Sequence, residues 1–132
     1  MLNDISNRER FDILVEEFCG AIGIQSEAEK VKNHQAFLAN DHRCQLEFNA
    51  SFDPDRAYVF VQATLADSNS EKTNLKNEAS VIEDGEVGYV QPENDRWIFA
   101  VVPFPLLDTD VNSLKIHVFS AIQGAQSLQQ QN

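Results

Sequence analysis

The sequence predicts an α+β fold: an antiparallel twisted sheet of about five strands, with an N-terminal and a C-terminal helix packed on it. Apolar residues recur at helical spacing near both ends of the 132-residue chain. Between the ends, several runs alternate apolar and polar residues, as half-buried strands do, and turn residues join them. Strands joined by short turns form antiparallel hairpins, and the terminal helices then cover one face of the sheet. The predicted order is α-β-β-β-α-β-β-α, in a single domain over residues 1–132.

The first helix is expected over residues 7–22. Ser6 and Glu9 have the spacing of a capping box, in which each side chain bonds the other residue's backbone N–H. Gly23 follows the last apolar residue and is well suited to end a helix. The apolar stripe of this helix comprises Phe11, Leu14, Val15, Phe18 and Ile22. Residues 25–35 are polar and are expected to form a loop, with one helical turn as a possibility.

Three strands are expected next. A short strand around residues 36–38 precedes a turn at Asn40-Asp41, and residues 43–52 then alternate cleanly between apolar and polar side chains. Residues 53–56 contain Pro54 and are typical of a turn. The return strand over residues 57–65 carries large apolar side chains on both of its faces.

The second half of the chain predicts another hairpin after a polar segment. Residues 67–80 are polar, with a short helix possible over 71–79. Residues 87–91 and 96–102 then form a hairpin joined through 92–95. Pro103 and Pro105 are expected to end the strand pairing, because proline has no backbone N–H to donate.

The last helix is expected to follow Asp108-Thr109-Asp110, whose side-chain oxygens can cap it. Asp108 and Asp110 could instead be a pair of reactive carboxylates, but helix capping accounts for both. Ile116 and Phe119 fall partly outside the inward stripe of this helix, and the end from Leu128 is expected to fray. The stripe comprises Val111, Leu114, Val118, Ala121, Ile122 and Ala125.

Composition excludes several classes of function. Ten Lys and Arg against 21 Asp and Glu give a formal net charge of −11, and the basic residues are scattered, so nucleic acid is not an expected partner. The acidic balance favours a basic or neutral partner. No apolar run is long enough to span a membrane. The stretch Met1–Asp4 lacks the basic and apolar regions of a secretory signal, so the protein is expected in the cytoplasm.

No group of residues has a spacing that only chemistry explains, so the protein is not expected to be an enzyme or to need a cofactor or metal. The glycines form no phosphate-binding loop. His34, His42 and His117 lack metal-ligand spacing, and Cys19 and Cys44 are expected to be buried free thiols. A Cys–His nucleophile at His42 and Cys44 is the alternative, but Cys44 lies on the apolar side of its strand, where burial raises a thiol pKa. An enzyme or ligand-binding domain with a pocket under the sheet would rest on these two residues.

Large apolar side chains exceed what one buried sheet face needs. Tyr58 and Phe60 share the second face of one strand, and Trp97 and Phe99 share a face of another. Such surfaces often mark partner sites or oligomer interfaces. The alternative is that a helix covers Tyr58 and Phe60 while Trp97 caps the core.

The stretch FDILVEEFCGAIGI contains the expected first helix, whose apolar stripe ends at an Ile-Gly pair. The stretch from Gly85 to Leu128 combines a hairpin, a proline-bearing exit and a helix opened by acids. In these features, and in size and low pI, the chain resembles the small type III secretion chaperones called the CesT or Tir-chaperone family. The resemblance implies a non-enzymatic homodimer in the bacterial cytoplasm. It would bind the unstructured N-terminal segment of an effector and keep it soluble and secretion-competent, without a nucleotide.

The resemblance also implies where partners bind. Effector contacts are expected in grooves lined by Phe11, Val15 and Phe18 of the first helix and by Tyr58 and Phe60, with core packing as the alternative for each. In the family, a leucine-rich second helix contributes to the dimer interface, whereas residues 67–80 are polar here.

The dimer interface is therefore expected on the last two strands, at Val87, Tyr89, Trp97 and Phe99. A protein-interaction or regulatory module of the same α+β shape, unrelated to secretion, is the alternative function.

Overall fold

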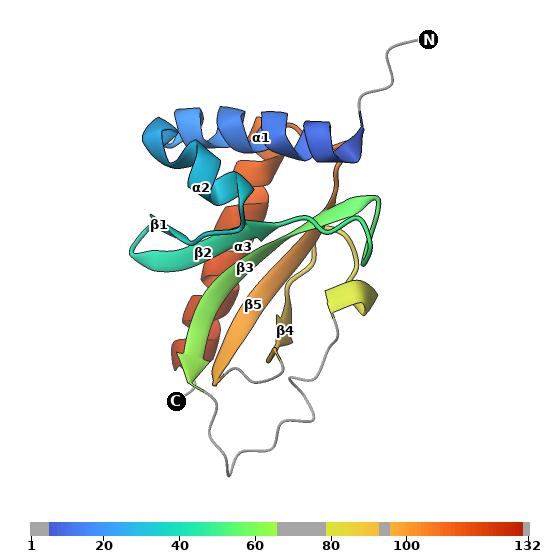
Figure 1. Ribbon diagram of the computed structural model, residues 1–132. Helices are drawn as coiled ribbons and strands as arrows, with labels where there is room; N and C mark the ends of the chain where they lie inside the picture. The colour runs from blue at the N-terminus through green and yellow to red at the C-terminus, as the bar shows by residue number, and fades with distance from the viewer. Residues whose placement is uncertain (1–5, 66–78, 93–95, 131–132) are drawn as a thin grey trace.

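The computed structural model describes residues 6–65, 79–92 and 96–130, and it confirms the predicted α+β class (Figure 1). The helical elements are α1 (Asn7–Ala21), η1 (Gln25–Glu27), α2 (Ala28–Lys32), η3 (Ala79–Val81) and α3 (Val111–Gln130). The strands are β1 (Phe37–Ala39), β2 (His42–Glu47), β3 (Arg56–Leu65), β4 (Gly88–Val90) and β5 (Trp97–Pro105). The helix considered over residues 71–79 lies outside the described residues apart from Ala79, as do Met1–Asp4 and most of the turn at 92–95.

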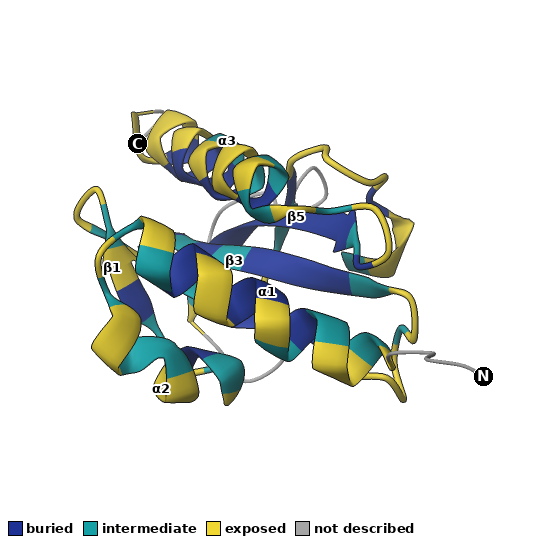
Figure 2. Ribbon diagram, turned by 90° about the horizontal axis from the view of Figure 1, so that it is seen from above, coloured by how far each residue is buried: buried dark blue, intermediate teal, exposed yellow. Residues whose placement is uncertain are grey.

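The five strands form one antiparallel sheet in the order β1-β2-β3-β5-β4. Helices α1 and α3 pack on the same face of this sheet, and each turns its buried residues toward the strands (Figure 2). The opposite face, called the outer face below, carries the alternate side chains of β3 and β5. The predicted two-layer arrangement, with both terminal helices on one face, is therefore confirmed.

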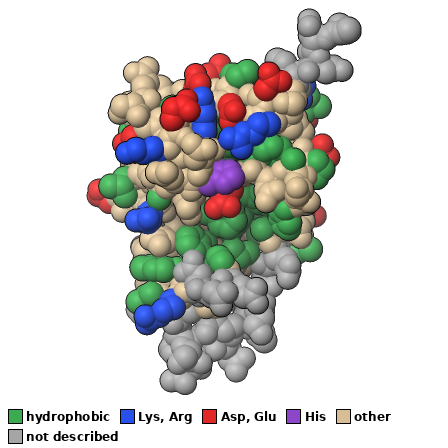
Figure 3. Space-filling view, in the orientation of Figure 1, with side chains coloured by type: hydrophobic (Ala, Val, Ile, Leu, Met, Phe, Trp, Pro, Cys, Tyr) green, Lys and Arg blue, Asp and Glu red, His purple; other side chains and the backbone are tan. Residues whose placement is uncertain are grey.

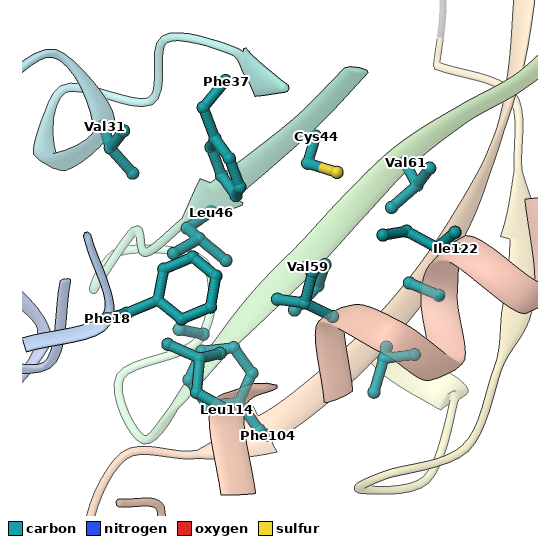
Figure 4. Close-up of a cluster of buried hydrophobic side chains, with 14 of the residues drawn as sticks. Phe18, Val31, Phe37, Cys44, Leu46, Val59, Val61, Phe104, Leu114 and Ile122 are labelled. Carbon is teal, nitrogen blue, oxygen red and sulfur yellow. The ribbon is translucent and has the colours of Figure 1, made fainter. Parts of the chain in front are cut away.

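The core lies between the two helices and the inner face of the sheet (Figure 4). Phe18 of α1, Leu114 of α3 and Leu46 of β2 are each at most 1% exposed. Burying a side chain of this size stabilises the fold by roughly 1.5–3 kcal/mol relative to exposure. The alternation of residues along β2 and β3 thus selects which side chains meet the helices.

Both ends of α1 follow the predicted local chemistry. The capping box is complete, because the Ser6 hydroxyl accepts from the Glu9 N–H and the Glu9 carboxylate accepts from the Ser6 N–H. Gly23 has φ +83° and donates to the Gly20 carbonyl at 3.3 Å, and Ile24 donates to the Cys19 carbonyl at 2.8 Å. These two bonds form a Schellman motif, which needs the left-handed conformation that glycine adopts readily. The predicted helix stop is confirmed.

In the first half of the chain, one possibility is realised and one predicted boundary was wrong. The helical turn considered within residues 25–35 is present, because residues 28–32 form α2 and Val31 is fully buried against the core. The strand predicted to reach Phe52 ends at Glu47. The Asn49 carbonyl accepts the N–H groups of both Phe52 and Asp53, so the chain turns there, and Phe52 is left 58% exposed.

Two expectations for the second half were also wrong. Strand β5 continues through Pro103 to Pro105, paired with β3. The Pro103 carbonyl accepts from the Gly85 N–H, so the hydrogen-bonding side of Pro103 faces away from β3. The N–H that proline lacks would therefore not have bonded β3, and no bond of the β3–β5 ladder is lost. At the C-terminus, α3 continues to Gln130 because Leu128 is buried, at 7% exposure, instead of fraying.

Candidate partner-binding site

Strand β1 is an edge strand, and its outward side is open within the described part of the chain. Asn40 and Asp41, with φ of 50° and 64°, form the two-residue turn to β2 that the sequence predicted. The ladder therefore starts at the hydrogen-bonded pair Ala39–His42, and along it hydrogen-bonded pairs alternate with pairs that are not hydrogen-bonded. By this alternation the backbone N–H and C=O of Leu38 point away from β2. They are available to another strand.

On the helix side of β1 lies a cleft of about 430 Å³, called the inner cleft below. It is formed where the end of α1, the strand β1 and the middle of α3 meet. Among its lining residues, Leu38 is 69% exposed and Phe119 is 52% exposed. Leu38 also lines a second cleft on the other side of β1, and its side chain alternates with that of the buried Phe37. The deeper apolar lining comprises Phe18, Ile22, Val118 and Ile122.

On the other side of β1 lies a more polar cleft of about 700 Å³, called the outer cleft, which includes Glu27 and Arg43. His34 shapes it from a left-handed conformation, φ 68°. The His34 carbonyl accepts from the Gln45 side chain at 3.0 Å, and its Nε2 accepts the Phe48 N–H at 3.3 Å. These bonds hold the segment that precedes β1 against β2 and the residue just after it.

The outer face of the sheet carries an apolar patch, visible below the charged side chains that cover the top of the molecule (Figure 3). Tyr58 and Phe99 are nearly buried in it, and Phe60 lies between them with ring centroids 6.4 and 6.1 Å away. Trp97 packs against the same cluster and is half-buried. The structure thus brings these four sequence-predicted residues together on one face.

The other predicted site residues lie elsewhere. Phe11, Val15 and Phe18 are at most 1% exposed and form the core, so they offer a partner little surface, although Phe18 also contributes to the floor of the inner cleft. Val87 and Tyr89 are on the helix side of the sheet. The Tyr89 hydroxyl donates to the Gly124 carbonyl of α3 at 2.9 Å.

The four residues expected at the dimer interface are therefore divided into two pairs on opposite faces of the sheet. Sequence reasoning did not select Leu38 and Phe119, which line the inner cleft. The signal for Phe119 was present, because it falls outside the inward stripe of its helix.

A cluster of ionic groups fixes the edge of the outer face. The Arg56 guanidinium contacts Asp53 at 2.9 Å and Asp84 at 3.1 Å, and it donates to the carbonyls of Ser80 and Ile82. The Tyr58 hydroxyl donates to Asp53 at 2.5 Å, and burial followed by this bond raises the pKa of Tyr58 to about 12. Arg56 thus ties the chain after η3 to the start of β3.

The residues considered for catalysis have structural contacts that account for their positions. Cys44 is fully buried, and burial raises its thiol pKa to about 12. The Cys44 thiol donates to the His42 backbone carbonyl at 3.5 Å, while the His42 ring bonds the Asn40 carbonyl. Asp110 caps α3 by accepting the Ser113 N–H at 2.8 Å. Hydrogen bonds from the backbone and side chain of Ser113 lower the pKa of Asp110.

Across residues 6–65, 79–92 and 96–130, no three His, Cys, Asp or Glu side chains gather as metal ligands. No helix in the described ranges has both the length and the apolar content to cross a membrane.

No protein-family model matches the sequence, and no curated protein matches it. Solved structures do match. A chain of the HopA1–SchA chaperone–effector complex aligns with a TM-score of 0.69 and 12% identity, over 98% of this chain and 99% of that chain. A chain of the complex between the Yersinia pestis type III secretion chaperone SycH and a stable fragment of YscM2 aligns at 0.60 and 19% identity, over 89% and 98%. A chain of the ExoT–SpcS complex from Pseudomonas aeruginosa aligns at 0.60 and 11% identity, over 89% and 96%.

These likenesses cover nearly the whole of each chain, and at such identities they establish the fold. The chain has the fold of the type III secretion chaperones, as the sequence predicted.

Proposed function

We propose that this protein is a type III secretion chaperone that binds the unstructured N-terminal segment of an effector and keeps it soluble and secretion-competent. The observation that carries the proposal is the shared fold, over 98% of this chain, with a chain of a chaperone–effector complex. The protein acts by binding, without catalysis, in the cytoplasm of a bacterium that has a type III secretion apparatus.

The geometry at β1 supports a mechanism for this binding. An extended segment adds to the sheet through the free N–H and C=O of Leu38, and its alternate side chains enter the inner cleft beside Phe119. Each large apolar side chain buried there contributes roughly 1.5–3 kcal/mol. Three-residue β1 alone supplies few backbone bonds. The effector segment therefore depends on further contacts along the chaperone surface.

The homodimer is the second part of the proposal. We place its interface on the outer face, where Phe60, Trp97 and Phe99 share one apolar cluster. Val87 and Tyr89 belong to the helix side and take no part in it. Apolar clusters rich in aromatic side chains are typical of the centre of oligomer interfaces. The inner cleft remains open in such a dimer, because it lies on the opposite side of the sheet.

Two matched substitutions separate the two surfaces. Phe60→Lys on the outer face is expected to change the light-scattering mass from about twice 14.9 kDa to the monomer value. Phe119→Lys in the inner cleft is expected to leave that mass unchanged and to weaken effector binding. Circular dichroism shows whether each variant is folded. A wild-type protein that is a strict monomer would contradict the proposed dimer.

The partner is tested by co-purification from the native host, with the bound protein identified by mass spectrometry. A secreted protein held through its N-terminal segment is the expected result. Leu38→Pro removes the outward N–H and is expected to abolish capture, while Leu38→Ala retains the backbone and is expected to weaken it less. No partner at all contradicts the proposal. A partner that is not secreted supports instead an interaction module unrelated to secretion.

A further inference from the structure

Lys115 is a cation without an ion-pair partner among the described residues of a strongly acidic protein. The ion pairs of the described chain join Arg8, Lys32 and Arg56 to nearby carboxylates, and none involves Lys115. The side chain is exposed and lines the inner cleft, one turn before Phe119 on α3. A chain with a net charge of −11 leaves this cation unneutralised beside its open edge strand.

The two clefts that flank β1 differ in charge. The inner cleft has Lys115 as its one charged lining residue, and the rest of its lining is apolar or uncharged. The outer cleft combines Arg43 with Glu27 and is also lined by His34. The inner cleft therefore presents a single positive charge next to apolar surface, whereas the outer cleft presents charges of both signs.

We propose that the segment pairing with β1 presents an aspartate or glutamate side chain to Lys115, and that this contact determines which segment is accepted. The inference rests on the proposed function. In an added strand, side chains two positions apart point to the same side. The carboxylate is therefore expected two residues from the apolar side chain that enters the inner cleft beside Phe119.

Discrimination arises from repulsion as well as attraction. Elsewhere the acidic surface disfavours a carboxylate, so an acidic residue in any other register loses affinity. A lysine or arginine at the position facing Lys115 places like charges together. Because Lys115 is exposed, the effect is modest, about two- to five-fold in Kd for gaining or losing one ion pair. It is large enough to choose between registers of one segment.

The test uses synthetic peptides that alternate serine and isoleucine, with one terminal isoleucine replaced by glutamate, glutamine or lysine. Each is titrated into the full-length ¹⁵N-labelled protein, and binding is followed at the amide signals of Leu38 and Phe119. The glutamate peptide is expected to bind about two- to five-fold tighter than the glutamine peptide, and the lysine peptide more weakly. In Lys115→Glu this order should reverse. Lys30→Glu makes the same charge change at an exposed lysine that lines neither cleft, and it should retain the wild-type order.

The other outcomes overturn the inference in distinguishable ways. If the glutamate, glutamine and lysine peptides all bind with the same affinity, Lys115 has no role in selecting the segment. The proposed binding site would still stand, because the Leu38 and Phe119 signals respond. A reversed order in Lys30→Glu as well would show that net charge, and not this contact, sets the preference. If no peptide perturbs Leu38 or Phe119, the proposed site at β1 fails, and the inference fails with it. Lys115→Gln, which is expected to abolish the preference without reversing it, guards against misfolding of the glutamate variant.

Discussion

Replacing Arg56 with methionine removes the guanidinium at the edge of the outer face and keeps most of the apolar stem. In the native protein this group contacts Asp53, Asp84, the Tyr58 hydroxyl and the carbonyls of Ser80 and Ile82, at 2.8–3.1 Å. All five of its N–H donors are close to acceptors. Without it, two carboxylates and two carbonyls each lose one donor, and Asp53 keeps its bond from the Tyr58 hydroxyl.

The magnitude follows from how exposed each partner is. The Asp84 side chain is 48% exposed, so water replaces Arg56 there and the loss is small, about 0–1 kcal/mol. The Arg56 and Asp53 side chains are only 19% and 15% exposed. Breaking a fully buried pair costs about 3–5 kcal/mol, and the residual exposure places this one at about 2–4 kcal/mol. For a chain of this length, that loss lowers the Tm by about 10 °C.

The assay is urea and thermal unfolding at one fixed protein concentration, because dimerisation would make the Tm depend on concentration. Arg56→Lys should recover less than half of the loss, since an ammonium group cannot replace the planar five-donor fork. Arg8→Met is the control: its pair with Asp12 has side chains 46% and 35% exposed and should contribute about 1 kcal/mol or less. If Arg56→Met is no more destabilising than Arg8→Met, the reasoning is wrong.

The same cluster makes the stability of the protein depend on pH. Burial opposes ionisation of Asp53, but hydrogen bonds from Tyr58 and Arg56 outweigh it, so the pKa of Asp53 in the folded protein is lowered. A carboxylate with a lowered pKa adds stability above its ordinary pKa, and that stability is lost as pH falls through the folded value. Wild-type stability should therefore drop more steeply below about pH 4 than that of Arg56→Met. Parallel pH profiles would contradict this coupling.

Three further outcomes are expected. Gly88→Ala should destabilise the protein by about 1–3 kcal/mol in urea unfolding, because the new Cβ would overlap the buried side chain of Ile82. Gly20→Ala in α1 meets only the flexible side chain of Gln25 and should be neutral or stabilising. Cys19 and Cys44, with pKa values raised by burial to about 11 and about 12, should resist alkylation near pH 8 until the protein unfolds, as mass spectrometry would show. Burial raises the pKa of Glu47, so Glu47→Gln should increase the Tm near pH 7 and not near pH 3.

Each of these expectations has a contrary result. Equal stability of the two glycine variants would mean that the sheet yields at Gly88 without strain. Rapid alkylation of the native protein would show that its thiols reach solvent. A Glu47→Gln variant that is stabilised equally at both pH values would show that its effect comes from packing and not from the cost of a buried charge.

Local chemistry made most of the fold predictable from the sequence. The capping box at Ser6, the helix stop at Gly23 and the turn at Asn40-Asp41 depend on residues within a few positions of one another. The alternation along β2 likewise identified its buried face, whereas β3 carries large apolar side chains on both faces. Distant contacts decided the rest. Val31 lies in a helix because the core buries it, and β5 passes through Pro103 because the side that lacks an N–H faces away from β3.

The sequence by itself determined the α+β class, the two terminal helices and the absence of any spacing that requires chemistry. It could not determine which apolar residues stay open to a partner. Phe11, Val15 and Phe18 enter the core, while Leu38 and Phe119, far apart in the chain, meet at one cleft. The reason is physical: hydrophobic periodicity shows which face of an element turns inward, but the strand order β1-β2-β3-β5-β4 decides which elements become neighbours.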